Sequence, residues 1–333
     1  MRVFSGIQPS GELHIGNYLG AVRNWVALQQ EHECFFCIVD YHAITQEYDR
    51  DSLDARTFDM AVSLLAAGID PGRCVLFVQS HVPEHTELAW VFITVTPLGE
   101  LERMTQFKDK SQRQVSVLAG LLCYPVLQAA DVLLYKADSV PVGEDQVQHI
   151  ELMREIARKW NVRFGRSFFA EPEARLTETG RIVGLDGQAK MSKSLGNTIG
   201  LLEEPDEIWQ HLRPAVTDPA RVKKTDPGNP EVCNIYSLHG QFSPADTVQE
   251  VARQCRSAGW GCLDCKRVLA NHVAEEFAPM RERARELRSN PSQVHEILED
   301  GAQRAQHVAR ETMREVRQRM GFLAAKGTAR TRC

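Results

Sequence analysis

The chain has 333 residues, 43% hydrophobic and 25% charged, which is typical of a folded globular protein and unlike disordered or fibrous chains. No apolar run approaches the roughly 20 residues that span a bilayer, and the N-terminus lacks an apolar signal core. We therefore expect a cytoplasmic protein with no membrane partner.

The net charge of −5 is unevenly spread, because residues 253–333 carry 16 Lys and Arg against 10 Asp and Glu. This basic segment indicates either a polyanionic partner, such as nucleic acid, or a helix surface with many ion pairs. Charge alone favours the second interpretation.

Alternating apolar and amphipathic segments predict an α/β protein with a parallel sheet covered on both faces. Strands are predicted at residues 3–7, in 34–45 before a polar loop, at 74–80, and at the start of 140–160. Helices are predicted from Ile15, with Ile15, Leu19, Val22 and Val26 on one face, and over 51–68, 83–95, 118–135 and the rest of 140–160. Residues 177–200 are predicted as an active loop. Helices follow from 203, with an irregular stretch at 218–233 and a helical pair at 272–288 and 292–322.

Two short motifs carry chemistry. After the first strand, a turn leads into a helix that begins with His14, Ile15, Gly16 and Asn17. Glycine costs a helix about 1 kcal/mol relative to alanine, so Gly16 indicates a ligand close to the backbone, such as a nucleotide phosphate. The second motif, "AKMSKSLGN" at 189–197, holds two lysines three residues apart on a loop. Lysines bind phosphate oxygens as mobile point charges, although the motif taken alone is a weak signal that favours a solvated loop.

Together and in this order, the two motifs resemble the signature sequences of class I aminoacyl-tRNA synthetases. The segments "GIQPSGELHIGNYLGA", "FCIVDYHAIT", "YPVLQAADVLLYKAD" and "VPVGEDQVQHIEL" are similar to those of bacterial tryptophanyl-tRNA synthetases over roughly residues 2–322. The resemblance implies a Rossmann-type catalytic domain over 1–200, with a lysine loop at 190–194. It also implies a helical anticodon-binding domain over 201–322, a flexible tail at 323–333, and a homodimer with an interface near residues 99–107.

The resemblance also implies how ATP is bound. Amino-acid activation sets a carboxylate against the α-phosphate of ATP, and such transfers are catalysed mainly by positioning and by neutralising negative charge. The implied catalytic residues are His14, Asn17, Lys190 and Lys193, with the two lysines on the departing pyrophosphate. Mg²⁺ would accompany ATP without a dedicated cage. The implied ATP-binding residues are Gln8, Pro9, Ser10, Gly16, Asn17, Gly143, Glu144, Asp145, Ile182, Lys190, Met191, Ser192, Lys193 and Ser194.

Asp131 lies in a mostly apolar helix, where a carboxylate is costly unless it has a partner. The residues alone leave open a surface Asp that faces solvent or pairs with Lys136. The resemblance implies that Asp131 accepts the indole N–H of tryptophan, and sites built around a polar partner discriminate by roughly 10⁴–10⁵. The implied tryptophan-binding residues are Phe4, Gly6, Tyr124, Gln128, Asp131 and Gln146.

Tyr124 and Gln146 would hold the ammonium and carboxylate groups of tryptophan. Gln128 stands where many members of the family have methionine, so the packing against the indole differs at that position. His42, at the predicted end of the second strand, is either a hydrogen-bonded loop residue or a functional one, and the residues alone do not decide between these roles.

Nine cysteines in a cytosolic chain argue against a disulfide framework. Cys34 and Cys37 lie in an apolar strand, where residues three apart point to opposite faces, and we predict that they belong to the core. Cys74 and Cys123 are predicted to be core residues as well.

The remaining cysteines before the C-terminus follow the spacing C-x21-C-x6-C-x2-C, at Cys233, Cys255, Cys262 and Cys265. Four thiolates suit a structural zinc or an iron–sulfur cluster, and a single C-x-x-C pair makes the zinc interpretation weaker. The arrangement resembles a subgroup of tryptophanyl-tRNA synthetases whose anticodon domain holds a [4Fe-4S] cluster, although the first spacer of that subgroup is one residue longer. The resemblance therefore implies a cluster, while zinc and unliganded thiols remain as alternatives.

The implied function is that of a tryptophan–tRNA ligase, which forms tryptophanyl-adenylate from ATP and L-tryptophan and transfers it to tRNA(Trp). Three alternatives remain: a tyrosyl-tRNA synthetase, a small nucleotidyltransferase, and a tRNA-binding or regulatory paralogue without catalysis. Asp131 favours tryptophan over tyrosine. The lysine loop and the basic helical segment disfavour the nucleotidyltransferase, and the retention of both motifs disfavours the paralogue.

Overall fold

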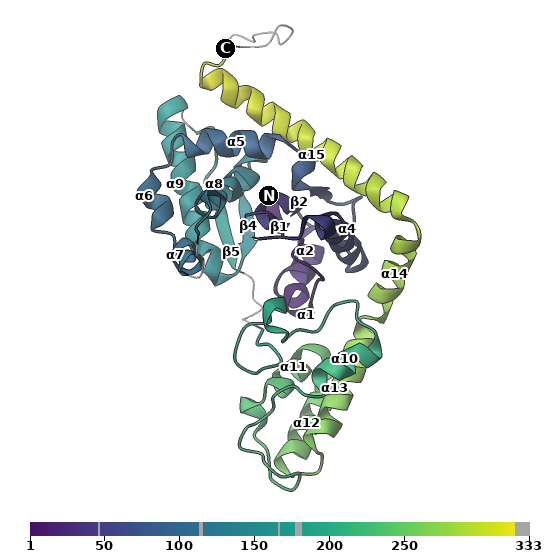
Figure 1. The fold of residues 1–333 in the computed structure, drawn as a ribbon. Coiled ribbons are helices and arrows are strands. Elements are labelled where there is room, and N and C mark those ends of the chain that lie inside the picture. The colour runs from purple at the N-terminus through teal and green to yellow at the C-terminus, as the bar shows by residue number, and fades with distance from the viewer. Residues whose placement is uncertain (46, 113–115, 166, 177–181, 324–333) are drawn as a thin grey trace.

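The computed structural model describes residues 1–333 except 46, 113–115, 166, 177–181 and 324–333. Its centre is a five-stranded sheet in the order β3-β2-β1-β4-β5, in which neighbouring strands run parallel (Figure 1). The strands are Arg2–Ile7 (β1), Glu33–Ile38 (β2), Val75–Val78 (β3), Ser139–Val142 (β4) and Glu173–Leu176 (β5). The predicted Rossmann-type parallel sheet is thereby confirmed.

Two local predictions about this sheet were wrong. The fifth strand was missed, because all four residues of β5 are exposed at the edge of the sheet and form no apolar run. The segment after β2 was predicted to be a loop, but it forms the one-turn helix α3 (Asp40–Ala43), which carries His42.

Helices cover both faces of the sheet (Figure 1). Because successive side chains of a strand point to opposite faces, β2 feeds two separate cores, with Cys34 in one and Cys37 in the other, as predicted. Cys74 is also buried, but Cys123 is only partly so, because its position on the helix places it at the edge of the core. The first core is covered by α2 (Arg23–Leu28) and α4 (Arg50–Ala66), and the second by α5 (Glu84–Ile93), α8 (Ala119–Leu134) and α9 (Val147–Phe164). The short helices α6 (Leu98–Glu102) and α7 (Thr105–Ser111) lie beside α8.

The first helix contains an irregularity that the sequence pattern did not predict. Helix α1 (Ile15–Asn17) continues through a π-helical turn over Tyr18–Val22 into α2. The wider π turn rotates the side chains that follow it. Trp25 therefore takes the fully buried position, and Val26, which was predicted on the buried face, is only partly buried.

From Pro205 onward the chain is mainly helical, as predicted. The helices of this part are α10 (Pro205–Leu212), α11 (Asn234–Phe242), α12 (Ala245–Arg256), α13 (Cys262–Glu276), α14 (Ala278–Ser289) and α15 (Pro291–Arg319). Helices α10 to α13 form an elongated lobe below the sheet, and α15 returns across the top of the molecule to lie against β3 (Figure 1). A glycine allows this contact, since a Cβ on Gly301 would lie 1.8 Å from the carbonyl oxygen of Leu76.

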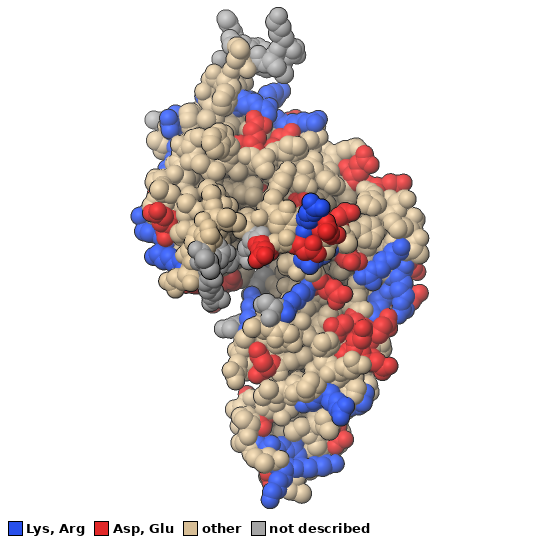
Figure 2. Space-filling model, viewed as in Figure 1, with Lys and Arg blue, Asp and Glu red and all other residues tan. Residues whose placement is uncertain are grey.

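The basic C-terminal segment forms many ion pairs. Figure 2 shows Lys and Arg interspersed with Asp and Glu on the face in view. Three of these pairs join α14 or α15 to the acidic first half of the chain, namely Arg288–Asp59, Arg310–Glu84 and Arg317–Glu87. A pair with both side chains exposed contributes about 0–1 kcal/mol, whereas Glu84 is largely buried. The favoured interpretation of the charge pattern, an ion-paired helix surface, is supported for this segment.

Candidate active site

The functional motifs meet where the strand order of the sheet reverses. Strand β1 lies between β2 and β4, and ligands of such sheets bind in the crevice outside the carboxyl ends of the strands at this point. The segment 8–17 follows β1 directly, and Gly143, Glu144, Asp145 and Gln146 follow β4. The two segments predicted to bind the nucleotide thus leave the sheet at adjacent strands.

Within the described part of the chain, no helix has the length and apolar character needed to cross a membrane.

His14 begins helix α1 as its N-cap. Its Nδ1 accepts a hydrogen bond from the backbone N–H of Asn17 at 3.3 Å, and the side chain of Asn17 accepts from the backbone N–H of His14 at 3.4 Å. Burial, and the nearby charges of Lys193 and Lys190, lower the pKa of His14 to about 4. His14 is therefore neutral near pH 7. Since Nδ1 accepts, its proton is on Nε2, which can donate to a phosphate oxygen.

Gly16 leaves room beside this histidine, because a Cβ there would lie 3.0 Å from His14 Nδ1 and 3.1 Å from Met191 Cβ. The turn before it contains Gly11, whose φ of +122° favours glycine. A Cβ on Gly11 would lie 3.0 Å from Nζ of Lys193. The structure thus brings one lysine of the second motif directly against the turn of the first.

The lysine loop is anchored to the first motif by backbone hydrogen bonds. Ile15 N–H donates to the carbonyl of Ile199 at 2.9 Å, and Leu201 N–H donates to the carbonyl of Leu13 at 2.7 Å. These bonds flank an antiparallel bridge between His14 and Gly200. The two motifs, far apart in the sequence, therefore form one unit.

Asn197 organises the lysine loop, and sequence analysis assigned it no role. Its side chain is buried, at 3% exposure. Its Oδ1 accepts a hydrogen bond from the backbone N–H of Ser192 at 2.7 Å. Its Nδ2 donates to Asp186 Oδ2 at 2.8 Å and to the carbonyl of Lys190 at 3.3 Å. The only available signal was its place at the end of the motif. Buried amides with every group paired hold a backbone in one shape, so Asn197 holds the stretch that carries both lysines.

The predicted tryptophan residues of α8 share one face of that helix. Tyr124, Gln128 and Asp131 are spaced by four and three residues. Gln128 Nε2 donates to Gln146 Oε1 at 3.4 Å, which joins this face to the segment after β4. Phe4 on β1 is buried nearby, with its ring 5.5 Å from that of Tyr135, and Gly6 is exposed at the carboxyl end of β1.

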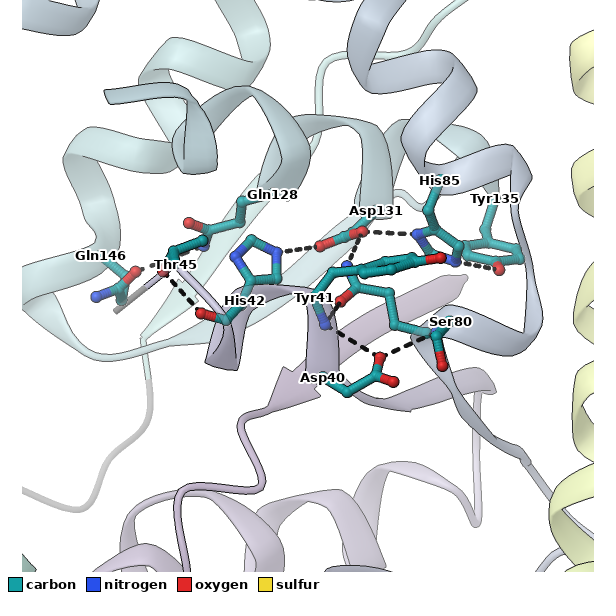
Figure 3. A network of polar contacts seen from close by, with 11 residues as sticks. Asp40, Tyr41, His42, Thr45, Ser80, His85, Gln128, Asp131, Tyr135 and Gln146 are labelled. Carbon is teal, nitrogen blue, oxygen red and sulfur yellow. Dashed lines mark hydrogen bonds and ion pairs between the residues drawn. The ribbon is translucent and has the colours of Figure 1, made fainter. Parts of the chain in front are cut away.

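Asp131 is 2% exposed, so the alternative of a surface aspartate was wrong. Its Oδ2 lies 2.7 Å from His42 Nε2, and its Oδ1 lies 2.6 Å from both Gln79 Nε2 and His85 Nδ1 (Figure 3). Burial alone would raise the pKa of Asp131. The charges and hydrogen bonds of His42 and His85 outweigh that effect and lower the pKa to about 2. His42 is therefore a buried hydrogen-bond partner of Asp131.

The other predicted ATP-binding residues differ in their burial. Gln8 and Ile182 are partly buried, Pro9 is buried, Ser10 is exposed, and Met191 is 4% exposed beside Gly16. Asp145 Oδ2 accepts from Gln146 Nε2 at 2.9 Å. The side chain of Ser194 lies outside the described residues.

The four spaced cysteines, Cys233, Cys255, Cys262 and Cys265, line one cavity in the helical lobe, together with Arg221 and Trp260. Burial, and the other three thiols, raise the pKa of Cys265 to about 12. Among the described residues, however, no three His, Cys, Asp or Glu side chains are placed so that they could hold one metal ion.

Comparison with known proteins decides the family. Residues 1–278 match the family model of class I tRNA synthetases (W and Y). The chain belongs to this synthetase family. A tryptophan–tRNA ligase of Deinococcus radiodurans is 57% identical to this synthetase over 97% of the chain and 99% of that protein, and one of Thermotoga maritima is 45% identical over 97% and 100%. The crystal structure of tryptophanyl-tRNA synthetase from Campylobacter jejuni, complexed with ADP and tryptophan, is 40% identical with a TM-score of 0.90, over 97% and 100% of the two chains.

Proposed function

We propose that this synthetase is a tryptophan–tRNA ligase of the bacterial cytoplasm. A carboxylate oxygen of L-tryptophan attacks the α-phosphorus of ATP, the bond from that phosphorus to the bridging oxygen of the β-phosphate breaks, and pyrophosphate leaves. The 2′-hydroxyl of tRNA(Trp) then takes the aminoacyl group from the adenylate, and AMP leaves. The high identity to named tryptophan–tRNA ligases supports this reaction over the tyrosine-specific one.

The observation that carries the proposal is the buried, ionised carboxylate of Asp131. It lies on the face of α8 that also carries Tyr124 and Gln128. Among the large aromatic amino acids Phe, Tyr and Trp, only tryptophan has a ring system with an N–H donor. A substrate without a ring donor, such as phenylalanine, would leave a buried acceptor unpaired, which costs about 1–3 kcal/mol or more for a charged group. In our proposal Tyr124 and Gln146 bind the ammonium and carboxylate of the substrate, and Phe4, Gly6 and Gln128 contact it.

On the ATP side, the residues of the two motifs neutralise and position the phosphates. His14 donates from Nε2, Asn17 supports it, and Lys190 and Lys193 bind the departing pyrophosphate, where negative charge develops. Gln8, Gly143 and Asp145 are among the residues that line the nucleotide, with a carboxylate available for the ribose hydroxyls. Mg²⁺ travels with ATP.

ATP–pyrophosphate exchange with each amino acid in turn tests this proposal. We expect exchange with tryptophan and background exchange with the others. Exchange with tyrosine instead would show that the chain is a tyrosyl-tRNA synthetase of the same family. No exchange with any amino acid, by protein with a cooperative unfolding transition, would favour the paralogue without catalysis.

We also propose that residues 201–322 bind the anticodon region of the tRNA and that Cys233, Cys255, Cys262 and Cys265 hold a [4Fe-4S] cluster there. The chemistry of the donor set supports this, because the four thiols share one cavity and Nη1 of Arg221 lies 3.8 Å from Cys262 Sγ, where it would offset thiolate charge. As described, the thiols are not yet placed to hold one metal ion, so binding would have to draw them together. The buried Nε of Arg221 has no hydrogen-bond partner among the described residues. A bound cluster would be structural, tying the start of α11, the end of α12 and the start of α13 together.

Iron and acid-labile sulfide, measured on protein purified without oxygen, test the cluster. We expect about four of each per chain, lost in Cys262→Ser and kept in Cys123→Ser, which changes a thiol outside the cavity. Zinc without sulfide, or iron that persists in Cys262→Ser, would contradict it.

We also propose that the protein is a homodimer. Light scattering of the same sample tests this, and a monomeric mass would exclude it.

A further inference from the structure

The hydrogen bonds around Asp131 do more than bury a charge. An ionised carboxylate has about four acceptor sites. Gln79 and His85 occupy two of them on Oδ1, and His42 occupies one on Oδ2. Among the partners that the structure describes, one site on Oδ2 is therefore left over. That oxygen faces the side of the network where His42, Gln128 and Gln146 lie, whereas His85 and Tyr135 lie on the opposite side (Figure 3).

His85 is well placed to set the orientation of this carboxylate. It comes from α5, is fully buried, and contacts Asp131 through Nδ1 and Tyr135 Oη through Nε2 at 2.7 Å. Because an ionised carboxylate only accepts hydrogen bonds, Nδ1 must carry a proton. When the imidazole is neutral, Nε2 is then the acceptor and the hydroxyl of Tyr135 is the donor.

Tyr135 is suited to that task. Burial, with the nearby Cys37, Asp131 and Glu84, raises the pKa of Tyr135 well above its usual value, so its hydroxyl keeps its proton. Its ring is fixed between aromatic neighbours, 4.7 Å from the ring of Phe35 and 5.5 Å from that of Phe4. A chain of hydrogen bonds thus runs from Tyr135 through His85 to Oδ1 of Asp131.

We propose that His85 is a positioning residue for substrate selection, and that Tyr135 fixes its tautomer, so that Asp131 keeps one acceptor site on Oδ2 for the indole N–H of tryptophan. This inference rests on the proposed function. It assigns a task to two residues that do not touch the substrate. A histidine of the wrong tautomer would point a lone pair at Oδ1, and the carboxylate would rotate or take up a proton, either of which removes the reserved acceptor.

Two amide substitutions at His85 separate the two contacts. The amide nitrogen of Asn falls near the position of Nδ1, so His85→Asn keeps a donor to Asp131 and loses the contact with Tyr135. The amide of Gln reaches the position of Nε2, so His85→Gln keeps a group near Tyr135 and loses the donor to Asp131. Tyr135→Phe removes one oxygen and keeps the stacked ring, which makes it the variant that disturbs packing least.

The readout is selection between two substrates in pyrophosphate exchange: L-tryptophan and β-(3-benzothienyl)-L-alanine, in which sulfur replaces the indole N–H. For the wild type we expect kcat/KM to favour tryptophan strongly. In His85→Gln and Tyr135→Phe we expect that preference to fall about 10- to 100-fold, through a higher KM for tryptophan with KM for ATP unchanged. His85→Asn should retain most of the preference.

A merely structural role gives a different pattern. If both substrates lose kcat/KM equally in His85→Gln and Tyr135→Phe, or if the preference is unchanged in both, the inference is wrong. Tyr135→Phe decides the question if His85→Gln does not fold. If the wild type shows no exchange with tryptophan, the proposed function fails first, and that result is seen before any variant is compared.

Discussion

Lys193→Ala is expected to lower kcat for pyrophosphate exchange by about 10²–10³, with KM for tryptophan changed less than about threefold. The ammonium of Lys193 lies against the Gly11 turn of the first motif, which in our proposal binds the phosphates. The loss of one preorganised group that meets developing charge costs about 3–4 kcal/mol. Lys223→Ala, at an exposed lysine of the helical lobe, is the control and should leave exchange unchanged. A large rise in KM for tryptophan with an unchanged kcat would contradict this role.

The same lysine predicts a pH dependence. Partial desolvation of the ammonium lowers the pKa of Lys193 to about 8, with Glu12 opposing the effect and Arg56 adding to it, although the residue as a whole is exposed. The ammonium is charged below this pKa and neutral above it, so kcat/KM for ATP should fall as the pH rises through about 8. An arginine remains protonated throughout this range. Lys193→Arg should therefore lack this alkaline fall, and a fall that persists in it would assign the titration to another group.

Gly301→Ala is expected to destabilise the protein by about 1–3 kcal/mol. Alanine is normally favoured over glycine inside a helix by about 1 kcal/mol, so propensity predicts the opposite sign. A steric clash outweighs this preference. The added Cβ would lie 1.8 Å from the carbonyl oxygen and 2.7 Å from the carbonyl carbon of Leu76, in the backbone of strand β3. Helix α15 would have to lift away from β3.

Gly240→Ala is the matched control, since Gly240 also lies within a helix and a Cβ there has no heavy atom within 4 Å. It should stabilise the protein by up to about 1 kcal/mol. Urea unfolding of both variants and the wild type measures the difference. Equal midpoints for Gly301→Ala and the wild type would show that α15 does not need the close contact with β3.

The two motifs of the candidate site were recognisable in the sequence, because each is a contiguous segment whose chemistry is local. The surroundings of Asp131 were not. Its partners come from α3, from the turn after β3, and from α5, and only the topology of the sheet brings His42, Gln79 and His85 together. A histidine within the apolar α5 was a visible but ambiguous signal.

The fold shows the same division between local and non-local information. Buried strands were predictable because they are continuous apolar runs, whereas β5 has four exposed residues and is a strand only because β4 pairs with it. Gly301 looks like a weak point in an otherwise regular helix. Its reason is a contact with Leu76, some 225 positions away in the chain, which no local pattern encodes.

The lysine loop is attached to the helical lobe as well as to the first motif. Asn234 Nδ2, at the start of α11, donates to the carbonyl of Gly184 at 2.7 Å, and Val216 N–H donates to the carbonyl of Leu185 at 2.8 Å. The segment that carries the lysines is therefore hydrogen-bonded to both parts of the molecule. If a partner binds one placement of α11 more tightly, and that placement alters the affinity for ATP, then ATP changes the affinity for that partner by the same factor.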